Sequence, residues 1–142
     1  MFQYDNARLS VCKIAESWIR TPFKEGAALK GLGVDCGRIL CCVYREAGFN
    51  TPDIKTLPHF PHGWFLHRNG EDYLDIVKNF TKETDESLPA NIVMFRIGRQ
   101  WAHAGIIIQW PKIVHAIDPM VQYGLDHQIP FVGKERMFLT PF

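Results

Sequence analysis

Hydrophobic positions follow a helical period in the first half of the chain and a strand-like period in the second. Helices are predicted where apolar side chains recur every three or four positions, over residues 6–19, 36–47 and 71–82. Strands are predicted where β-branched and aromatic residues gather, over residues 92–97, 102–108 and 112–117 and near 137–139. Helices followed by strands predict an α+β domain with an antiparallel sheet.

Length and composition narrow the class of protein. A chain of 142 residues, 46% hydrophobic and 13% aromatic, fits one globular domain over residues 1–142. The net charge of +1 gives no electrostatic basis for binding nucleic acid or an anionic membrane. No segment approaches the ~18 apolar residues that cross a bilayer. The N-terminus lacks the pattern of a signal peptide, so cytoplasmic synthesis is expected.

Cys36 is the first residue that suggests chemistry. Asp35 is a strong helix N-cap residue and Gly48 is a natural stop, so Cys36 falls in the first turn of the helix predicted over 36–47. A thiol there feels the positive end of the helix dipole and the unpaired N–H groups of the first turn. Both favour the reactive thiolate. The alternative is a small buried core residue.

The helical period also assigns the faces of this helix. Cys36 heads a buried stripe that continues through Ile39, Leu40, Val43 and Ala47. Arg38 and Arg45 lie away from that stripe and are expected to point to solvent. The four cysteines of the chain show no zinc-type spacing, so reduced thiols are expected.

Two histidines lie in consecutive predicted strands. Side chains alternate between the faces of a strand, so the faces of His103 and His115 depend on the hairpin between them. An odd number of loop residues, for example three, puts both histidines on one face as near neighbours. If the Cys36 helix packs against that face, a nucleophile, a base and an orienting group meet. A structural role, or a zinc site with Cys36, is the alternative.

These residues resemble the NlpC-type cell-wall peptidase family, which is papain-like. The ordered set that carries the resemblance is Trp18-Ile19-Arg20-Thr21-Pro22-Phe23, Asp35-Cys36-Gly37-Arg38-Ile39-Leu40, Val43-Tyr44, Pro89-Ala90-Asn91-Ile92-Val93-Met94-Phe95, His103-Ala104-Gly105-Ile106 and His115-Ala116. His103 and His115 are 12 residues apart, as in members with a Cys-His-His triad. The stretch PHGWFLHRNGEDYL is similar to one in small phage-type members.

The resemblance implies a papain-like α+β fold and a cysteine hydrolase of amide bonds in peptidoglycan stem peptides. Cys36 would be the nucleophile that forms a thioester, His103 the base and His115 the orienting group. No cofactor and no metal are implied. Phage tail proteins are the partners that the phage-type members suggest, with delivery to the cell wall as part of a tail.

The chain departs from the family pattern at two places. Gly37-Arg38 stands where Ser-Gly is usual, and Phe23 stands where a tyrosine often supplies an oxyanion donor. Phenylalanine has no donor, and losing one such donor can lower turnover roughly 10²–10³-fold. Phe23 therefore favours a second hypothesis, a catalytically weak or silent structural component of a phage tail. A thiol amidase or acyltransferase with another substrate is the third.

The segment around residues 59–67 contains three histidines, His59, His62 and His67, among aromatic residues. A metal site is conceivable there, and a packed loop is the simpler interpretation. A third possibility is that Trp64 and His67 line the substrate cleft, because loops above a rigid sheet commonly bind ligands. With Asp35 and Phe23, they are the predicted substrate-binding residues.

Overall fold

The structure of the protein is a computed structural model, and it describes residues 3–58, 72–128 and 133–142. The three predicted helices are present as α1 (Gln3–Ser17), α2 (Arg38–Glu46) and α3 (Asp72–Lys78). A short 3-10 helix, η1 (Ile54–Thr56), lies between α2 and α3. The helical period of the sequence therefore identified the right segments, and the ends of the helices differ by a few residues.

The strands form one large antiparallel sheet, as predicted. Its strand order is β3-β8-β4-β5-β6-β7. The strands are β3 (Lys82–Thr84), β4 (Ile92–Ile97), β5 (Gln100–Gln109), β6 (Lys112–Ile117), β7 (Met120–Leu125) and β8 (Arg136–Thr140). A 3-10 helix, η3 (Asp126–Gln128), follows β7, and a separate small hairpin pairs β1 (Ala28–Leu29) with β2 (Gly33–Val34). Strands β3 and β7 and the small hairpin were not predicted.

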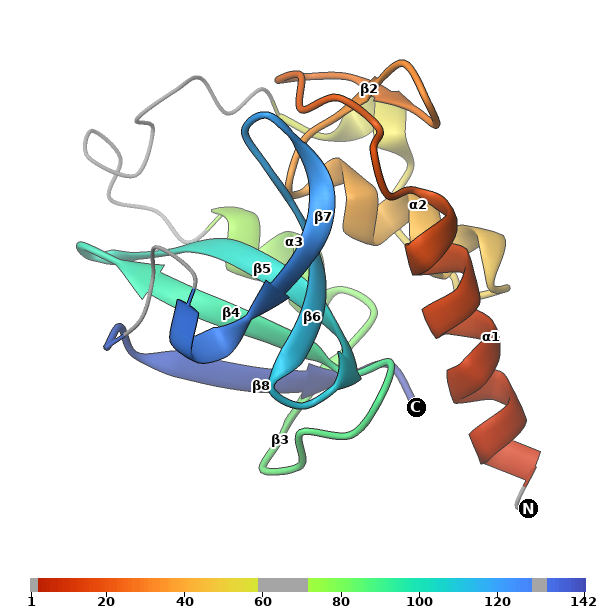
Figure 1. Ribbon diagram of the computed structural model, residues 1–142, viewed down its shortest axis with the longest axis vertical. Coiled ribbons are helices and arrows are strands. Elements are labelled where there is room, and N and C mark those ends of the chain that lie inside the picture. Colours follow the sequence, from red (N-terminus) through yellow and green to blue (C-terminus); the bar gives the residue numbers. More distant parts are fainter. Residues whose placement is uncertain (1–2, 59–71, 129–132) are drawn as a thin grey trace.

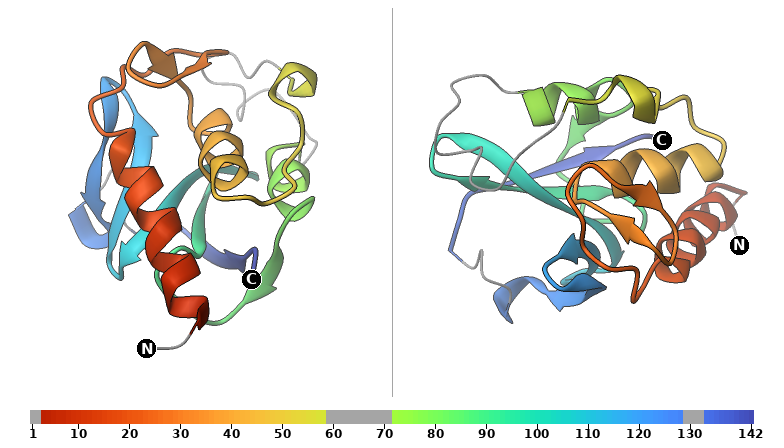
Figure 2. Two further views of the ribbon diagram at one scale, coloured as in Figure 1. Left: turned by 90° about the vertical axis from the view of Figure 1, so that its right-hand side faces the viewer. Right: turned by 90° about the horizontal axis from the view of Figure 1, so that it is seen from above.

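Helices α1 and α2 cover one face of the large sheet (Figures 1 and 2). The main core joins the apolar side chains of the helices to those of that face, among them Ile39, Leu40, Val43, Tyr44, Met94, Ala102, Ala104, Ile106 and Val114. A smaller core of Val93, Phe95, Ile107 and Ile113 lies on the opposite face. Each large side chain buried in this way contributes roughly 1.5–3 kcal/mol, so the two cores together fix which face each strand residue takes.

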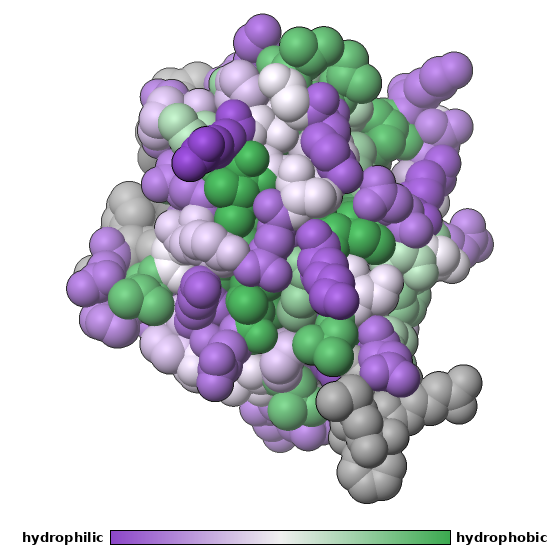
Figure 3. Space-filling view, turned by 45° about the vertical axis from the view of Figure 1, so that its right-hand side comes forward, coloured by the Kyte–Doolittle hydropathy of each residue, from purple (hydrophilic) through white to green (hydrophobic). Residues whose placement is uncertain are grey.

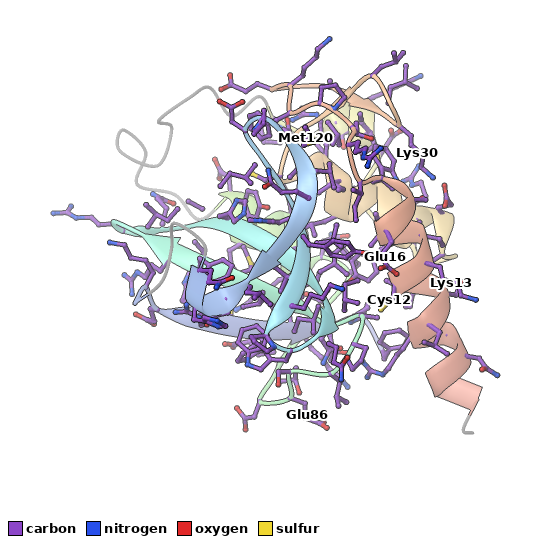
Figure 4. The ribbon with its side chains drawn as sticks, in the orientation of Figure 1. Cys12, Lys13, Glu16, Lys30, Glu86 and Met120 are labelled. Atoms are coloured by element: carbon purple, nitrogen blue, oxygen red, sulfur yellow. The ribbon has the colours of Figure 1, made fainter. Side chains whose placement is uncertain are left out.

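Helix α1 is attached to the sheet through side chains on one side of it. Figure 4 shows Cys12 and Glu16 on the side that faces the sheet and Lys13 on the outer side. The thiol of Cys12 lies 3.6 Å from the carbonyl oxygen of Ile107 in β5. The carboxylate of Glu16 accepts a hydrogen bond from the hydroxyl of Tyr123 in β7. The helix thereby contacts β5 and β7, the two strands on either side of β6.

The surface mixes polar and apolar side chains. On the face drawn in Figure 3, hydrophobic residues are separated by hydrophilic ones. Leu29 and Leu32, in and beside the small β1–β2 hairpin, are among the large apolar residues that are exposed. Within the described ranges, no helix combines the length and the apolar character that crossing a bilayer requires.

Candidate active site

Cys36 lies in the turn that leads into α2. The helix itself begins at Arg38, two residues later than predicted, and Cys36 and Gly37 form the preceding turn. Asp35 still caps this end, because its Oδ1 accepts a hydrogen bond from the backbone N–H of Arg38 at 2.8 Å. The N–H of Ile39 donates to the carbonyl oxygen of Asp35 at 3.1 Å. Asp35 therefore accepts from the first N–H of α2 as a capping side chain does, although the N-cap position of the helix is occupied by Gly37.

Arg38 does not point to solvent, and that expectation was wrong. Its side chain is buried, and Nη1 forms an ion pair with Asp35 Oδ2 at 2.8 Å. Nη2 donates to the carbonyl oxygens of Leu57 and Pro58 at 3.2 and 3.1 Å. The helical period cannot foresee this inward turn, because it depends on a buried carboxylate and on carbonyls about twenty residues away. Arg45 is exposed, as predicted.

The segment before Cys36 is fastened to one end of the large sheet. The N–H of Phe23 donates to the carbonyl oxygen of Pro119 at 2.9 Å, in the turn between β6 and β7. Phe23 also forms an isolated parallel β-bridge with Val34, which lies two residues before Cys36. The turn at Pro119 directly follows Ile117, the last residue of β6. Cys36 is thus tied to the end of the sheet that β6 reaches after passing through His115.

His103 and His115 lie on the same face of the sheet and are in direct contact. His103 Nε2 and His115 Nδ1 are 2.9 Å apart, and the two rings meet edge to face. The predicted shared face is confirmed, although the hairpin reaches it differently. Only Trp110 and Pro111 separate β5 from β6, and an irregularity between Ile107 and Gln109 adds one residue to β5. That extra residue gives the odd count that the prediction required.

Burial keeps both imidazoles neutral. It lowers the pKa of His115 from 6.5 to about 4 and holds the pKa of His103 well below 6.5, where His115 adds a further lowering. Between two neutral rings, one nitrogen donates and the other accepts. If His103 donates from Nε2 to His115 Nδ1, the Nδ1 of His103 keeps its lone pair. In that tautomer Nδ1 is the basic nitrogen of His103, and His115 has the orienting role.

The body of α2 packs against the opposite face of the sheet from the histidines. Leu40 and Val43 of the helix share a core with Ala104 of β5, whereas His103 stacks on Phe95 in the direction of the smaller core. The body of α2 therefore does not meet the condition stated for the three groups, which was packing of the Cys36 helix on the histidine face. A contact between the thiol and His103 has to be made beyond the end of the helix, where Cys36 precedes its body, and this contact stays a prediction.

Tyr73 of α3 is a site residue that sequence reasoning missed. Its hydroxyl donates a hydrogen bond to the carbonyl oxygen of Cys36 at 2.8 Å, and its side chain is buried. The helical period placed Tyr73 correctly on the apolar side of a helix and gave no indication of its partner. The available signal was chemical, because a buried tyrosine hydroxyl requires a hydrogen-bond partner.

The pKa of the Cys36 thiol lies above its ordinary value, which works against the thiolate expected at a helix end. Burial and, after it, the negative charge of Asp35 raise this pKa to about 12, against a smaller lowering by a hydrogen bond from Tyr73. The first-turn N–H groups and the helix dipole also favour the thiolate, but loss of solvent outweighs them. The nucleophile therefore needs a base at the moment of reaction.

The rate at which iodoacetamide alkylates Cys36 is expected to rise about ten-fold per pH unit between pH 7 and 9. The thiolate fraction grows in that proportion below a pKa of about 12. Peptide mass spectrometry would follow Cys36 separately. Cys42 in the neighbouring helix α2, with its pKa raised to about 11, gives an internal comparison. A rate for Cys36 that is level between pH 6 and 8 would instead show a preformed thiolate–imidazolium pair.

The other predicted binding residues are placed as follows. The carboxylate of Asp35 is engaged by the chain itself, since Oδ2 also accepts from the N–H of Gly26 at 2.8 Å. Phe23 is half-buried and packs against the main core. Trp64 and His67, with the rest of the histidine-rich segment, lie outside the described residues. Elsewhere in the chain, in the part that the structure describes, no group of three or more His, Cys, Asp and Glu side chains could hold a metal ion.

An open groove of about 530 Å³ adjoins the histidine pair. Its lining includes His115 and Gln122, which are paired across β6 and β7, together with Lys112 and Asp118. One positive and one negative side chain therefore border the same groove as the orienting histidine. A ligand in this groove would lie beside His115.

Comparisons with known proteins identify the fold. No protein-family profile and no curated protein matches the sequence. Among solved structures, the NlpC/P60 domain of the peptidoglycan hydrolase SagA has a TM-score of 0.61 and 14% identity, covering 95% of this chain and 98% of that domain. A protein similar to lipoprotein of the NLP/P60 family from Staphylococcus aureus has a TM-score of 0.68 and 16% identity over 97% of this chain.

A third similar structure is NlpC1 from Trichomonas vaginalis, with a TM-score of 0.64 and 12% identity over 95% of this chain. The chain spans 43% of the Trichomonas protein and 42% of the Staphylococcus protein, so it corresponds to a part of each. The predicted papain-like α+β fold of the NlpC/P60 type is confirmed.

Proposed function

We propose that this chain, with its NlpC/P60 fold, is a thiol hydrolase that cleaves an amide bond in the stem peptide of peptidoglycan. Cys36 is the nucleophile, His103 the base and His115 the orienting group. The observation that supports this most directly is the 2.9 Å contact between His103 Nε2 and His115 Nδ1. In the tautomer in which Nε2 donates to His115, Nδ1 is the nitrogen of His103 that would take the proton. SagA, which has the same fold, is described as a peptidoglycan hydrolase.

The proposed reaction has two halves. In the first, the proton of the Cys36 thiol passes to His103 Nδ1 while the sulfur attacks the amide carbon, and the same proton is then given to the leaving amine. The acyl group remains on the sulfur as a thioester. In the second, His103 takes a proton from water, the hydroxide attacks the thioester, and the proton returns to the sulfur as the carboxylic acid leaves.

Backbone N–H groups of the first turn near Cys36 supply donors for the oxyanion. Asp35 acts in this scheme through Arg38 and the turn, holding Cys36 in position, and its carboxylate is not free to bind substrate. Phe23, Trp64 and His67 are kept as proposed substrate contacts. The groove beside His115, bordered by Lys112 and Asp118, offers both charges to a stem peptide, which carries amino and carboxylate groups.

Digestion of purified peptidoglycan tests the proposal. Wild-type protein is expected to release peptide fragments that mass spectrometry identifies, and Cys36→Ala is expected to release none, because the thioester cannot form. Cys42→Ala removes a half-buried thiol of α2, beyond the turn that carries Cys36, and should cleave like wild type. Equal fragments from Cys36→Ala, or none from the wild type, would contradict the assignment.

A second candidate function is a structural component of a phage tail that retains the fold without activity. Phe23 favours it, because no hydroxyl is present where the resembling family often has one. A thiol amidase or acyltransferase with another substrate is a variant of the first proposal. An added amine acceptor separates the two enzymes, since an acyltransferase forms the new amide and a hydrolase releases the acid.

A further inference from the structure

Tyr73 reaches Cys36 from a different part of the chain. The hydroxyl of Tyr73 in α3 donates to the Cys36 carbonyl oxygen at 2.8 Å, across 37 positions of sequence. The side chain is 1% exposed, so this hydroxyl has little access to water. A donor held at the backbone of a cysteine is also close to its sulfur, and a hydrogen bond from Tyr73 favours the thiolate by lowering the pKa of Cys36.

Gly37 makes room for the tyrosine ring. A methyl group added at Gly37 would lie 3.2 Å from Tyr73 Cε2, tighter than ordinary van der Waals contact. The ring therefore lies directly against the backbone of the residue after Cys36. Gly37 is also one of the two positions where the chain departs from the pattern that it resembles, and Phe23 is the other. Tyr73 connects these two departures. Phe23 lacks the hydroxyl that the family often has there, and Tyr73 brings a hydroxyl to Cys36 in the space that Gly37 leaves open.

We propose that Tyr73 is a positioning residue of the thiol chemistry, holding the Cys36 turn by its carbonyl and donating to the sulfur once the thiol proton has left. This inference rests on the proposed nucleophilic role of Cys36. When the S–H bond breaks, the proton goes to His103 Nδ1 and the electron pair stays on sulfur. The hydroxyl of Tyr73 then turns from the carbonyl to the sulfur, because a charged acceptor forms the stronger hydrogen bond.

Alkylation of Cys36 in Tyr73→Phe tests the inference without any substrate. Losing a hydrogen bond to a charged group is expected to lower the thiolate fraction, and with it the iodoacetamide rate at every pH between 7 and 9, by about ten-fold. Peptide mass spectrometry would follow Cys36, and the whole pH profile should shift upward by about one unit. Because no peptidoglycan is present, failure of the proposed function and failure of this inference can be told apart.

Tyr44→Phe is the matched control. Tyr44 is also fully buried, and its hydroxyl donates to the carbonyl oxygen of Ala90 at 2.7 Å. This variant loses a buried hydrogen bond of the same kind away from the thiol, so the Cys36 profile should stay at the wild-type position. An unchanged profile in Tyr73→Phe, or equal shifts in both variants, would overturn the inference.

Gly37→Ala provides a second test if Tyr73→Phe fails to fold. The added methyl group presses on the ring of Tyr73 and leaves the hydroxyl in the protein, so the Cys36 rate should fall about two- to five-fold in a folded chain. Thermal melting would establish that the chain is folded. A Cys36 rate equal to that of the wild type in folded Gly37→Ala would count against the role of Tyr73.

Discussion

Asp35→Ala is expected to lower the free energy of unfolding by about 3–5 kcal/mol, the cost of leaving a buried charge without its partner. The carboxylate accepts three hydrogen bonds of 2.8 Å each, from the backbone and Nη1 of Arg38 and from the backbone of Gly26. Removing it leaves the buried guanidinium with two carbonyl acceptors and no counter-charge. Urea unfolding at pH 7 would measure the loss.

Glu46→Ala is the control for this prediction. Glu46 pairs with Lys30 at 3.5 Å on the surface, where the two side chains are 50% and 39% exposed. Exposed pairs contribute about 0–1 kcal/mol, so this variant should unfold close to wild type. If Asp35→Ala cost no more than Glu46→Ala, the buried pair would not be what holds the turn before α2.

A double variant separates two contributions of Asp35, its charge beside Arg38 and its hydrogen bonds to backbone N–H groups. In Asp35→Ala combined with Arg38→Met, no charge remains unpaired, so the double variant should be less destabilised than the sum of the two single variants by about 0.5–3 kcal/mol. Strict additivity would mean that Asp35 acts only through its hydrogen bonds to backbone N–H groups. The turn that carries Cys36 depends on both contributions.

The second large effect is a loss of stability in acid. Burial lowers the pKa of His115 from 6.5 to about 4, so the unfolded chain binds a proton below pH 6.5 that the folded chain refuses. Stability therefore falls as the pH drops through this window and is unaffected by this group above it. At 1.36 kcal/mol per pKa unit, His115 alone accounts for about 3 kcal/mol by pH 4. His103, shifted in the same direction, adds to the loss.

Urea unfolding at pH 7 and pH 5 measures this effect in wild type, His115→Gln and His127→Gln. Between these two values the wild type should lose about 2 kcal/mol more than His115→Gln, because the variant no longer has that buried imidazole. His127 is exposed beyond β7 and serves as the control for loss of an imidazole outside the core. Equal losses in all three proteins would show that His115 is not kept neutral by burial.

Local pattern explains what the sequence could predict. The main helices and the central strands follow from the spacing of apolar residues, and the cap at Asp35 follows from residue type and position. Strand β7 had a signal that was not used, since Val121, Tyr123 and Leu125 alternate with Gln122 and Gly124. The short strands β1 and β2 have two residues each, too few for any period to register.

The rest of the candidate site depends on tertiary contacts. Arg38 turns inward because the Asp35 carboxylate and two distant carbonyl oxygens lie there, and a helical wheel shows neither those carbonyls nor the burial of the carboxylate. The hydroxyl of Tyr73 meets Cys36 only once α3 is in place. The raised pKa of Cys36 was not predicted, because the dipole of a helix end can be inferred from sequence and the loss of solvent around a side chain cannot.

The extra residue between Ile107 and Gln109 sets a rule for how this hairpin can vary in length. His115 shares a face with His103 only because the two loop residues and the one extra residue of β5 together make an odd number. In a related chain that lost a single residue from the tip, the second imidazole would point to the face that the helices cover. Loss of two residues would keep it on the same face as His103. Natural variation in the tip should therefore come in even steps.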